Sequence, residues 1–271
     1  MNRVLINGEA VNTVSVADRG LHYGDGIFET IAVKNGQTQY WDRHQQRLIA
    51  GCHRLTLPIP DMKTLQREIL SITSDQTEAV LKIIITRGQG GRGYIVPDNI
   101  LTTRIVACYQ YPDYPMSYWE QGVKVRLCQT PLSMNPALAG IKHCNRLEHI
   151  LARNEWQDLD IAEGLMLDSQ HNVIEGTMSN LFIVRNGRLI TPTVTQCGVE
   201  GVIRGVVMDA ARDQKIALSV DNISVNDVLD ADEVFLTNSV IGIWPVRQFE
   251  GHSYTQGPMT RRMMEHLASH S

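Results

Sequence analysis

The stretch Asn135–Arg153, NPALAGIKHCNRLEHILAR, places Lys142 after an apolar approach and just before an expected helix. The residues from Pro136 to Gly140 leave the stem of this lysine little water, and Asn145 is the expected N-cap of an amphipathic run that continues to about Trp156. Desolvation penalises the ammonium form, so the pKa of Lys142 should fall from about 10.4 towards neutrality. The stretch therefore predicts a nucleophilic amine. The plainer alternative is a loop lysine that keeps its charge in water.

The composition around this stretch is that of an ordinary globular protein, with 271 residues, 43% hydrophobic and 20% charged. A net charge of -4 and the lack of a basic run argue against nucleic acid or an anionic membrane as the main partner. No segment approaches the about 20 apolar residues of a membrane span, and no signal peptide is evident, so we expect a cytoplasmic protein. The five cysteines form no CxxC pair, which predicts reduced thiols and no zinc site.

The hydrophobic pattern predicts two domains of mixed helices and strands, an α+β or α/β arrangement. Residues 1–111 form the smaller α+β domain, a proline- and aromatic-rich linker at 112–120 is not expected to form regular structure, and residues 121–271 form the larger domain. Strands are expected at 3–6, 27–34, 38–40, 79–86, 104–111, 123–128, 163–167, 181–184, 188–191 and 233–237. Helices are expected at 42–55 (with Asp42 as cap), 62–73, 201–215 and 260–268.

The glycine-rich loop Gly88–Gly93 matches the GxGxxG pattern of dinucleotide sites, but its context does not fit. Such a site needs a helix that opens on the last glycine, and here Pro97 follows strand-like residues. Arg92 on this loop is suited to bidentate binding of a carboxylate. The alternative is a mobile surface loop without a ligand.

Two further features are candidate ligand sites. Gly198–Arg204 passes from a glycine turn into a helix, which leaves backbone N–H groups free for a phosphate, and Arg47 on an early helix would add a charged contact. Glu175 lies in an expected loop before a buried strand, where it either caps a turn or holds a proton on a ring nitrogen. The sequence has no HExxH, GxSxG or P-loop pattern, so no metal site is predicted.

A desolvated lysine, a carboxylate, a phosphate seat at a helix start and an arginine are the groups that pyridoxal 5'-phosphate requires. The chain also resembles, over nearly its whole length, the class IV pyridoxal-phosphate enzymes, which include the D-amino acid and branched-chain aminotransferases. The motifs that carry this resemblance are His44-x-x-Arg47-Leu48, Ala139-Gly140-Ile141-Lys142, Glu175-Gly176-x-x-Ser179-Asn180-Leu181-Phe182 and Gly201-Val202-Ile203-Arg204.

The resemblance implies a role for each matching residue. Lys142 would bind the cofactor covalently and Glu175 would pair with its pyridine nitrogen. The phosphate would be held by Arg47, the N–H groups of Val202 and Ile203, and Ser239. The substrate would be contacted by Arg92 and Asn238 at its carboxylates and by Thr30 near its reacting carbon. The larger domain is then the cofactor-binding domain, and a homodimer is expected by analogy.

Within the family, the chain is more similar to the lyase members than to the aminotransferases. The lyase-like motifs are Val16-x-Asp18-Arg19-x-x-x-Tyr23-Gly24-Asp25-Gly26-x-Phe28-x-Thr30, Arg87-Gly88-x-Gly90-Gly91-Arg92-Gly93-Tyr94 and Asn135-Pro136-x-Leu138-Ala139-Gly140-Ile141-Lys142-His143-x-Asn145-Arg146-Leu147-Glu148. Branched-chain aminotransferases carry a tyrosine five residues after the lysine, where this chain has Leu147. The sequence thus predicts a pyruvate-releasing lyase. The alternatives are an aminotransferase on the same fold and a cofactor-binding regulatory protein without turnover.

Overall fold

The computed structural model describes residues 3–96 and 98–269 and divides the chain into two compact units. Unit 1 comprises Met1–Pro112 and Ile141–Asn145, and unit 2 comprises Asp113–Gly140 and Arg146–Ser271. This division differs from the expected limits at three places. Pro112 belongs to unit 1, residues 113–120 belong to unit 2, and the segment that carries Lys142 belongs to unit 1.

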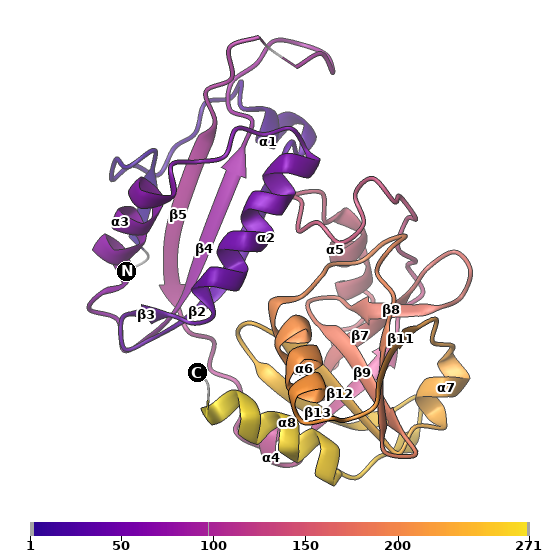
Figure 1. Ribbon diagram of the computed structural model, residues 1–271. Helices are drawn as coiled ribbons and strands as arrows, with labels where there is room; N and C mark the ends of the chain where they lie inside the picture. Colours follow the sequence, from indigo (N-terminus) through magenta and orange to yellow (C-terminus); the bar gives the residue numbers. More distant parts are fainter. Residues whose placement is uncertain (1–2, 97, 270–271) are drawn as a thin grey trace. The chain divides into compact units, whose positions relative to one another are not determined.

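Unit 1 is built on a five-stranded sheet in the order β1-β5-β4-β2-β3, and all its pairings are antiparallel (Figure 1). The strands are β1 (Arg3–Ile6), β2 (Gly26–Lys34), β3 (Gln37–Thr38), β4 (Glu78–Thr86) and β5 (Thr103–Gln110), and the helices are α1 (Arg19–Tyr23), α2 (Trp41–Arg54) and α3 (Met62–Thr73). Alternation along β2 places Ile27 and Ile31 in one core with Leu48 of α2 and Leu65 of α3. Both helices therefore cover the same face of the sheet.

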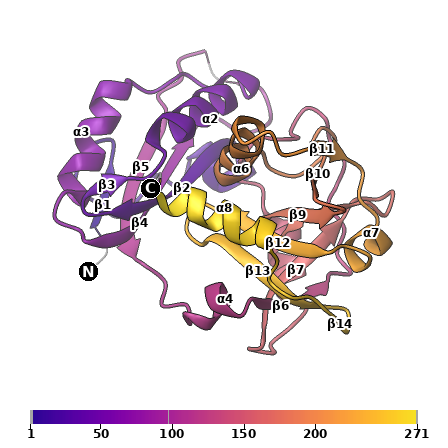
Figure 2. The same cartoon turned by 60° about the horizontal axis from the view of Figure 1, so that its bottom comes forward.

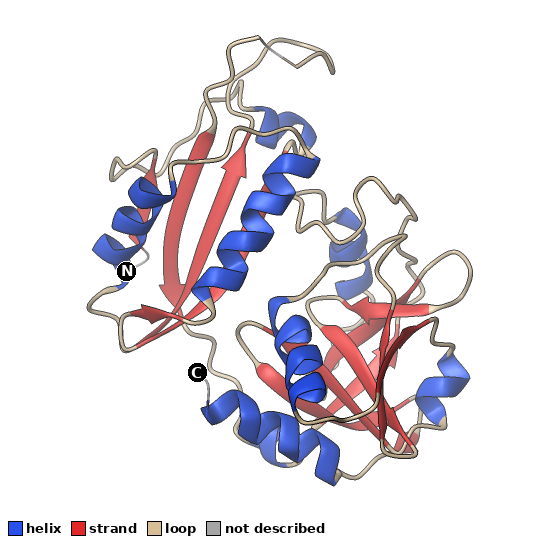
Figure 3. Ribbon diagram, viewed as in Figure 1, coloured by secondary structure: helices blue, strands red, loops and turns tan. Residues whose placement is uncertain are grey.

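Unit 2 contains a nine-stranded sheet in the order β11-β10-β9-β12-β13-β6-β7-β8, with β14 paired to β13. Figure 3 draws the strands in red and the helices in blue. Its strands are β6 (Val123–Leu127), β7 (Ile161–Leu167), β8 (Val173–Gly176), β9 (Asn180–Arg185), β10 (Arg188–Pro192), β11 (Leu218–Asp221), β12 (Glu233–Asn238), β13 (Gly242–Phe249) and β14 (His252–Ser253). Its helices are α4 (Ser117–Glu120), α5 (Leu147–Arg153), α6 (Val202–Asp213), α7 (Val225–Leu229) and α8 (Pro258–Ser269).

Strand β8 also pairs with β9, through Glu175 and Asn180, and this pairing closes six strands of unit 2 into a ring. The ring encloses apolar side chains such as Leu165, Leu181 and Trp244, which are fully buried. Helices α6 and α8 pack against each other and against β12 (Figure 2). The first turn of α6 is thereby held at a fixed place on the unit.

The structure corrects several expected elements. Tyr40, in a left-handed conformation, is the N-cap of α2, so Asp42 lies inside the first turn. Asn145 does not cap α5, which begins after Arg146; its side chain donates instead to the Gly24 carbonyl. Glu175 lies on strand β8 and not in a loop.

Other elements were not expected at all. The stretch expected to be irregular contains the one-turn helix α4, whose Trp119 indole donates to the Ile241 carbonyl. Strands β8, β11, β13 and β14 and helices α1 and α7 were also missed. Within residues 3–96 and 98–269, no helix is long and apolar enough to cross a membrane.

The cysteines among the described residues are all free thiols, as the sequence predicted. Burial raises the pKa of Cys52 to about 11 and those of Cys128 and Cys197 to about 12. These three thiols are therefore protonated at neutral pH and serve as core residues.

Candidate functional site

The segment that carries Lys142 is fixed to the edge of unit 1 through β2. The Lys142 carbonyl accepts a hydrogen bond from the Phe28 N–H at 2.9 Å, and the Cys144 N–H donates to the Gly26 carbonyl at 2.9 Å. The Lys142 ammonium nitrogen lies 4.3 Å from the centroid of the Phe28 ring. Lys142 is half-buried, so its amine packs against the Phe28 ring and does not extend fully into water.

Thr30 lies on the same face of β2 as Phe28, two residues further along the strand, and is paired with Lys82 on β4. The Lys82 ammonium nitrogen is 5.2 Å from the same Phe28 ring. Unit 1 therefore brings Lys142, Phe28 and Thr30 together, and Lys82 is a second amine near them.

The Arg47 guanidinium does not stand alone, because it is bound to the buried carboxylate of Glu29. Arg47 Nε donates to Glu29 Oε1 at 2.8 Å, a second nitrogen donates to Oε2, and His44 Nδ1 lies 2.6 Å from Oε2. Burial by itself would raise the pKa of Glu29, but the charge of Arg47 and the hydrogen bonds from Arg47 and His44 lower it to about 2. Glu29 is thus an ionised carboxylate that fixes the direction of Arg47.

We expect Glu29→Gln to lower the free energy of unfolding of the cofactor-free protein by about 3 kcal/mol at neutral pH, because the charge of Arg47 loses its buried partner. A carboxyl group whose pKa is lowered on folding contributes stability above its unfolded pKa, about 4.3, and this contribution is lost as the pH falls towards the folded value. Denaturant unfolding of both proteins at neutral pH and at about pH 3 measures the effect, which should shrink at the lower pH.

The control is Asp75→Asn, which breaks an exposed ion pair with Arg3 and should have a much smaller effect. Equal effects of the two substitutions, or a Glu29→Gln effect that does not change with pH, would contradict this account of the buried pair.

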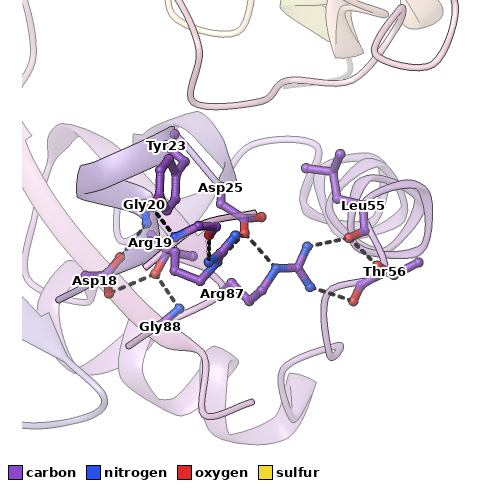
Figure 4. Close-up of polar contacts among 12 residues, drawn as sticks. Asp18, Arg19, Gly20, Tyr23, Asp25, Leu55, Thr56, Arg87 and Gly88 are labelled. Atoms are coloured by element: carbon purple, nitrogen blue, oxygen red, sulfur yellow. Dashed lines mark hydrogen bonds and ion pairs between the residues drawn. The ribbon is translucent and has the colours of Figure 1, made fainter. Parts of the chain in front are cut away.

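The loop that carries Arg92 is exposed, but its base is held by a buried polar network (Figure 4). Arg19 and Arg87 both donate to Asp25 Oδ2, at 3.0 and 2.7 Å, and Arg19 also donates to the Gly93 carbonyl at 3.0 Å. Burial would raise the pKa of Asp25, and the two guanidinium groups reverse this and lower it. The Arg92 side chain makes no hydrogen bond or ion pair with the part of the chain that the structure describes.

No helix opens on this loop among the described residues 88–96 and 98–102, so the loop does not fit a dinucleotide site, as the sequence indicated. Gly88 has φ +80, and a Cβ there would lie 1.8 Å from the Leu101 carbonyl oxygen, so the sharp turn requires glycine. Pro97, which supported the same argument, lies outside the described residues.

In unit 2, Glu175 is buried on β8 and is held by three neighbours. Val199 N–H donates to Oε2 at 2.8 Å, Asn180 Nδ2 lies 3.3 Å from the same oxygen, and His149 Nε2 lies 3.1 Å from Oε1. The carboxylate is oriented by contacts from β9, α5 and the segment before α6. A residue that only caps a turn does not require hydrogen bonds from three separate segments, so this geometry favours a ligand-binding carboxylate.

The first turn of α6 carries Val202 and Ile203, the residues predicted to bind a phosphate through their N–H groups. Its N-cap is Gly201 and no side chain caps the helix, so the N–H groups of Val202 and Ile203 have no acceptor among residues 98–269. A Cβ on Gly201 would lie 1.9 Å from Asn180 Oδ1, so only glycine allows this close approach. Unit 2 thus offers a carboxylate and an anion seat, the two groups that fit the ring nitrogen and phosphate of pyridoxal phosphate.

Asn238 is the last residue of β12, and Ser239 follows it. Asn238 Oδ1 accepts from the N–H groups of Val240 and Ile241, at 2.8 and 2.9 Å, and Nδ2 donates to the Met178 carbonyl. The side chain therefore shapes the turn and retains one N–H for a ligand. Ser239 is half-buried in the same turn.

Four residues that support the predicted site residues were not predicted from the sequence. Glu29 carried a signal, because alternation along its strand places it on the buried face between Ile27 and Ile31. Glu163 is fully buried and accepts hydrogen bonds from Thr177, Met178 and Ser179, which fixes the turn after Glu175. His149 and Asn180 had no such signal, since both act through a tertiary contact.

Comparisons with known proteins identify the family of the chain. The family model for class IV aminotransferases matches residues 26–249. An aminodeoxychorismate lyase from Vibrio harveyi is 36% identical, covering 97% of this chain and 98% of that protein. A crystal structure of 4-amino-4-deoxychorismate lyase from Pseudomonas aeruginosa has a TM-score of 0.94 and 43% identity, covering 98% of each chain.

A putative branched-chain-amino-acid aminotransferase from Methanocaldococcus jannaschii is 30% identical, covering 97% of this chain and 94% of that protein. The aminotransferase relative is thus less similar than the two lyases over the same length. The family model spans most of the chain, and the expected fold is confirmed. This chain belongs to the class IV aminotransferase family.

Proposed function

We propose that this protein is a pyridoxal-phosphate-dependent lyase that converts 4-amino-4-deoxychorismate to 4-aminobenzoate and pyruvate. The observation that carries the proposal is the match, over 98% of both chains, to a 4-amino-4-deoxychorismate lyase at 43% identity and a TM-score of 0.94. Each unit, taken by itself, carries residue types that this reaction requires.

Bound pyridoxal phosphate supplies an electron sink for the charge that remains when a proton leaves the substrate carbon. Lys142 would bind the cofactor covalently and would act as the general base that removes the proton at C4. Glu175 would hold a proton on the pyridine nitrogen. The phosphate would be held by Val202, Ile203, Ser239 and Arg47, with Arg47 oriented by Glu29.

The reaction is an elimination within the substrate. The C4–H bond breaks at Lys142, the C3–O bond breaks, and the departing enolpyruvyl group takes up a proton to become pyruvate. The ring gains aromaticity, which makes the step strongly favourable. An aminotransferase would instead return the proton to the cofactor, so the outcome depends on the leaving group beside the reacting carbon.

The aminotransferase alternative is disfavoured by Leu147, whose side chain is 73% exposed at the start of α5. This position carries a tyrosine in the branched-chain enzymes that the sequence resembles. A leucine provides no hydroxyl near the cofactor. Release of pyruvate and 4-aminobenzoate, compared with amino transfer from leucine and D-alanine, tests the proposal.

We also propose a cytoplasmic homodimer. Unit 1 exposes large apolar side chains near the Arg92 loop, namely Val16, Leu21, Tyr94, Ile95 and Leu101, each at least 65% exposed. Exposed apolar residues in this number are typical of a surface that another chain covers. Nucleic acid and membrane are not proposed as partners.

Arg92 is the proposed contact for a substrate carboxylate, with Asn238 as a second polar contact and Thr30 near the reacting carbon. We expect Arg92→Ala to lower kcat/KM. The loss of transition-state stabilisation calculated from kcat/KM should be about 1.5–3 kcal/mol, the scale of a hydrogen bond to a charged group, while the absorbance of the bound cofactor stays unchanged. Arg92→Lys should recover only part of this loss, because a point charge cannot form the bidentate contact.

The matched control is Gln89→Ala, which changes an exposed side chain on the same loop and should leave kcat/KM unaltered. If Arg92→Ala has no larger effect than Gln89→Ala, Arg92 does not bind the substrate.

A further inference from the structure

The carboxylate of Glu175 has room for one more hydrogen bond. An ionised carboxylate offers about four acceptor positions, two on each oxygen. Val199 and Asn180 take both positions on Oε2, and His149 takes one on Oε1. The remaining position on Oε1 is the one left for the pyridine nitrogen. His149 is the neighbour that shares this oxygen.

The state of the His149 ring follows from its surroundings. Nδ1 is buried and has no hydrogen-bond partner in the described parts of the chain, while Nε2 lies at the carboxylate. An imidazolium would place an N–H at Nδ1 without an acceptor. The Nδ1–H tautomer would do the same and would also point a lone pair of Nε2 at Oε1. Only the neutral ring with its hydrogen on Nε2 avoids both costs.

Helix α5 holds the ring in this place. Glu148, the neighbour of His149 on the helix, accepts a hydrogen bond from the Ser133 N–H at 3.1 Å. The His149 side chain is 12% exposed, so the packing around it limits its rotamers. The imidazole therefore reaches Glu175 from a backbone position that is fixed independently.

We propose that His149 is a positioning residue that fixes Glu175 Oε1 as a neutral Nε2–H donor. This rests on the proposed function, in which Glu175 pairs with the pyridine nitrogen. All three donors to the carboxylate are then uncharged, and Arg204, the buried guanidinium of α6, is occupied by Thr191 and the Pro192 carbonyl. In the part of the chain that the structure describes, Arg204 acts on Glu175 only through its charge and donates no hydrogen bond to it. None of the three hydrogen bonds that Glu175 accepts then comes from a cation, which would offset its negative charge more strongly at this short range.

The first test uses the cofactor-free protein labelled with ¹⁵N in its histidines. Long-range ¹H–¹⁵N spectra at neutral pH, with the His149 signals assigned by their loss in His149→Gln, should show a protonated Nε2 and an unprotonated Nδ1. Two protonated nitrogens, or a hydrogen on Nδ1, would overturn the proposal. This readout is independent of the reaction, so it stands even if the wild-type protein releases no pyruvate from 4-amino-4-deoxychorismate.

The second test compares three substitutions in the loaded enzyme. Glutamine can place an amide N–H where Nε2 lies, whereas asparagine is too short and leucine has no donor. We expect His149→Leu and His149→Asn to lower kcat by about 10-fold or more with a smaller change in KM, the scale seen for partners that orient a ligand-binding group. His149→Gln should recover most of this loss.

The control is His252→Leu, which removes an exposed histidine of β14. Bound cofactor labelled with ¹⁵N at the ring nitrogen gives a second readout: its protonated signal should persist in His149→Gln and weaken in His149→Leu. If His149→Leu changes kcat and this signal no more than His252→Leu does, His149 does not position Glu175.

Discussion

Lys142→Ala should abolish covalent attachment of pyridoxal phosphate. It should also lower kcat by roughly 10²–10⁴-fold, the contribution of a general base. Noncovalent binding of the cofactor should survive, because the carboxylate of Glu175 and the first turn of α6 do not depend on this side chain. The absorbance of the bound cofactor and the rate of pyruvate release measure the two effects. The matched control is Lys34→Ala at the exposed end of β2, which should leave both unchanged.

Borohydride reduction of the loaded enzyme and peptide mapping then identify the attached lysine. The competing candidate is Lys82, whose ammonium nitrogen is 5.2 Å from the Phe28 ring, compared with 4.3 Å for Lys142. We expect the label on Lys142, because the backbone of its segment is bound to Phe28 and Gly26. A label on Lys82 would remove the basis for the role of Lys142.

Glu175→Gln should lower kcat by roughly 10²-fold or more, the loss that follows removal of one preorganised electrostatic group. The amide has nearly the same shape but no charge, so the pyridine nitrogen loses the partner that keeps it protonated. Cofactor affinity should fall far less than kcat, since α6 still holds the phosphate. Steady-state kinetics and cofactor titration give the two quantities.

Glu163→Gln is a useful comparison, because Glu163 is buried in the same region and fixes the turn after Glu175 without taking part in the chemistry. Glu163→Gln should lower the free energy of unfolding, whereas kcat should not fall more than cofactor affinity does. Turnover of Glu175→Gln equal to wild type would mean that Glu175 only shapes its strand.

The sequence predicted the elements whose own residues favour them. The β-branched run of β4 and the apolar periodicity of α3 gave strand and helix with accurate limits. Strand β8 was missed because Val173–Gly176 is short and ends in Glu and Gly, which disfavour strands. It forms because β7 and β9 both pair with it, which no local pattern reveals.

The same distinction holds for the site. Lys142 and the start of α6 were chosen from the sequence because of their immediate neighbours, an apolar approach and a glycine turn, and their roles stay predictions. The partners of Glu175 could not be predicted, since His149 is 26 residues away in sequence and meets it only through folding. The expected lowering of the Lys142 pKa stays a prediction.

The reaction itself is tested when the wild-type protein, loaded with pyridoxal phosphate, is given 4-amino-4-deoxychorismate and both products are measured. We expect equal amounts of pyruvate and 4-aminobenzoate, with slower amino transfer from leucine and D-alanine. Faster amino transfer from either amino acid than pyruvate release from 4-amino-4-deoxychorismate would contradict the proposed function.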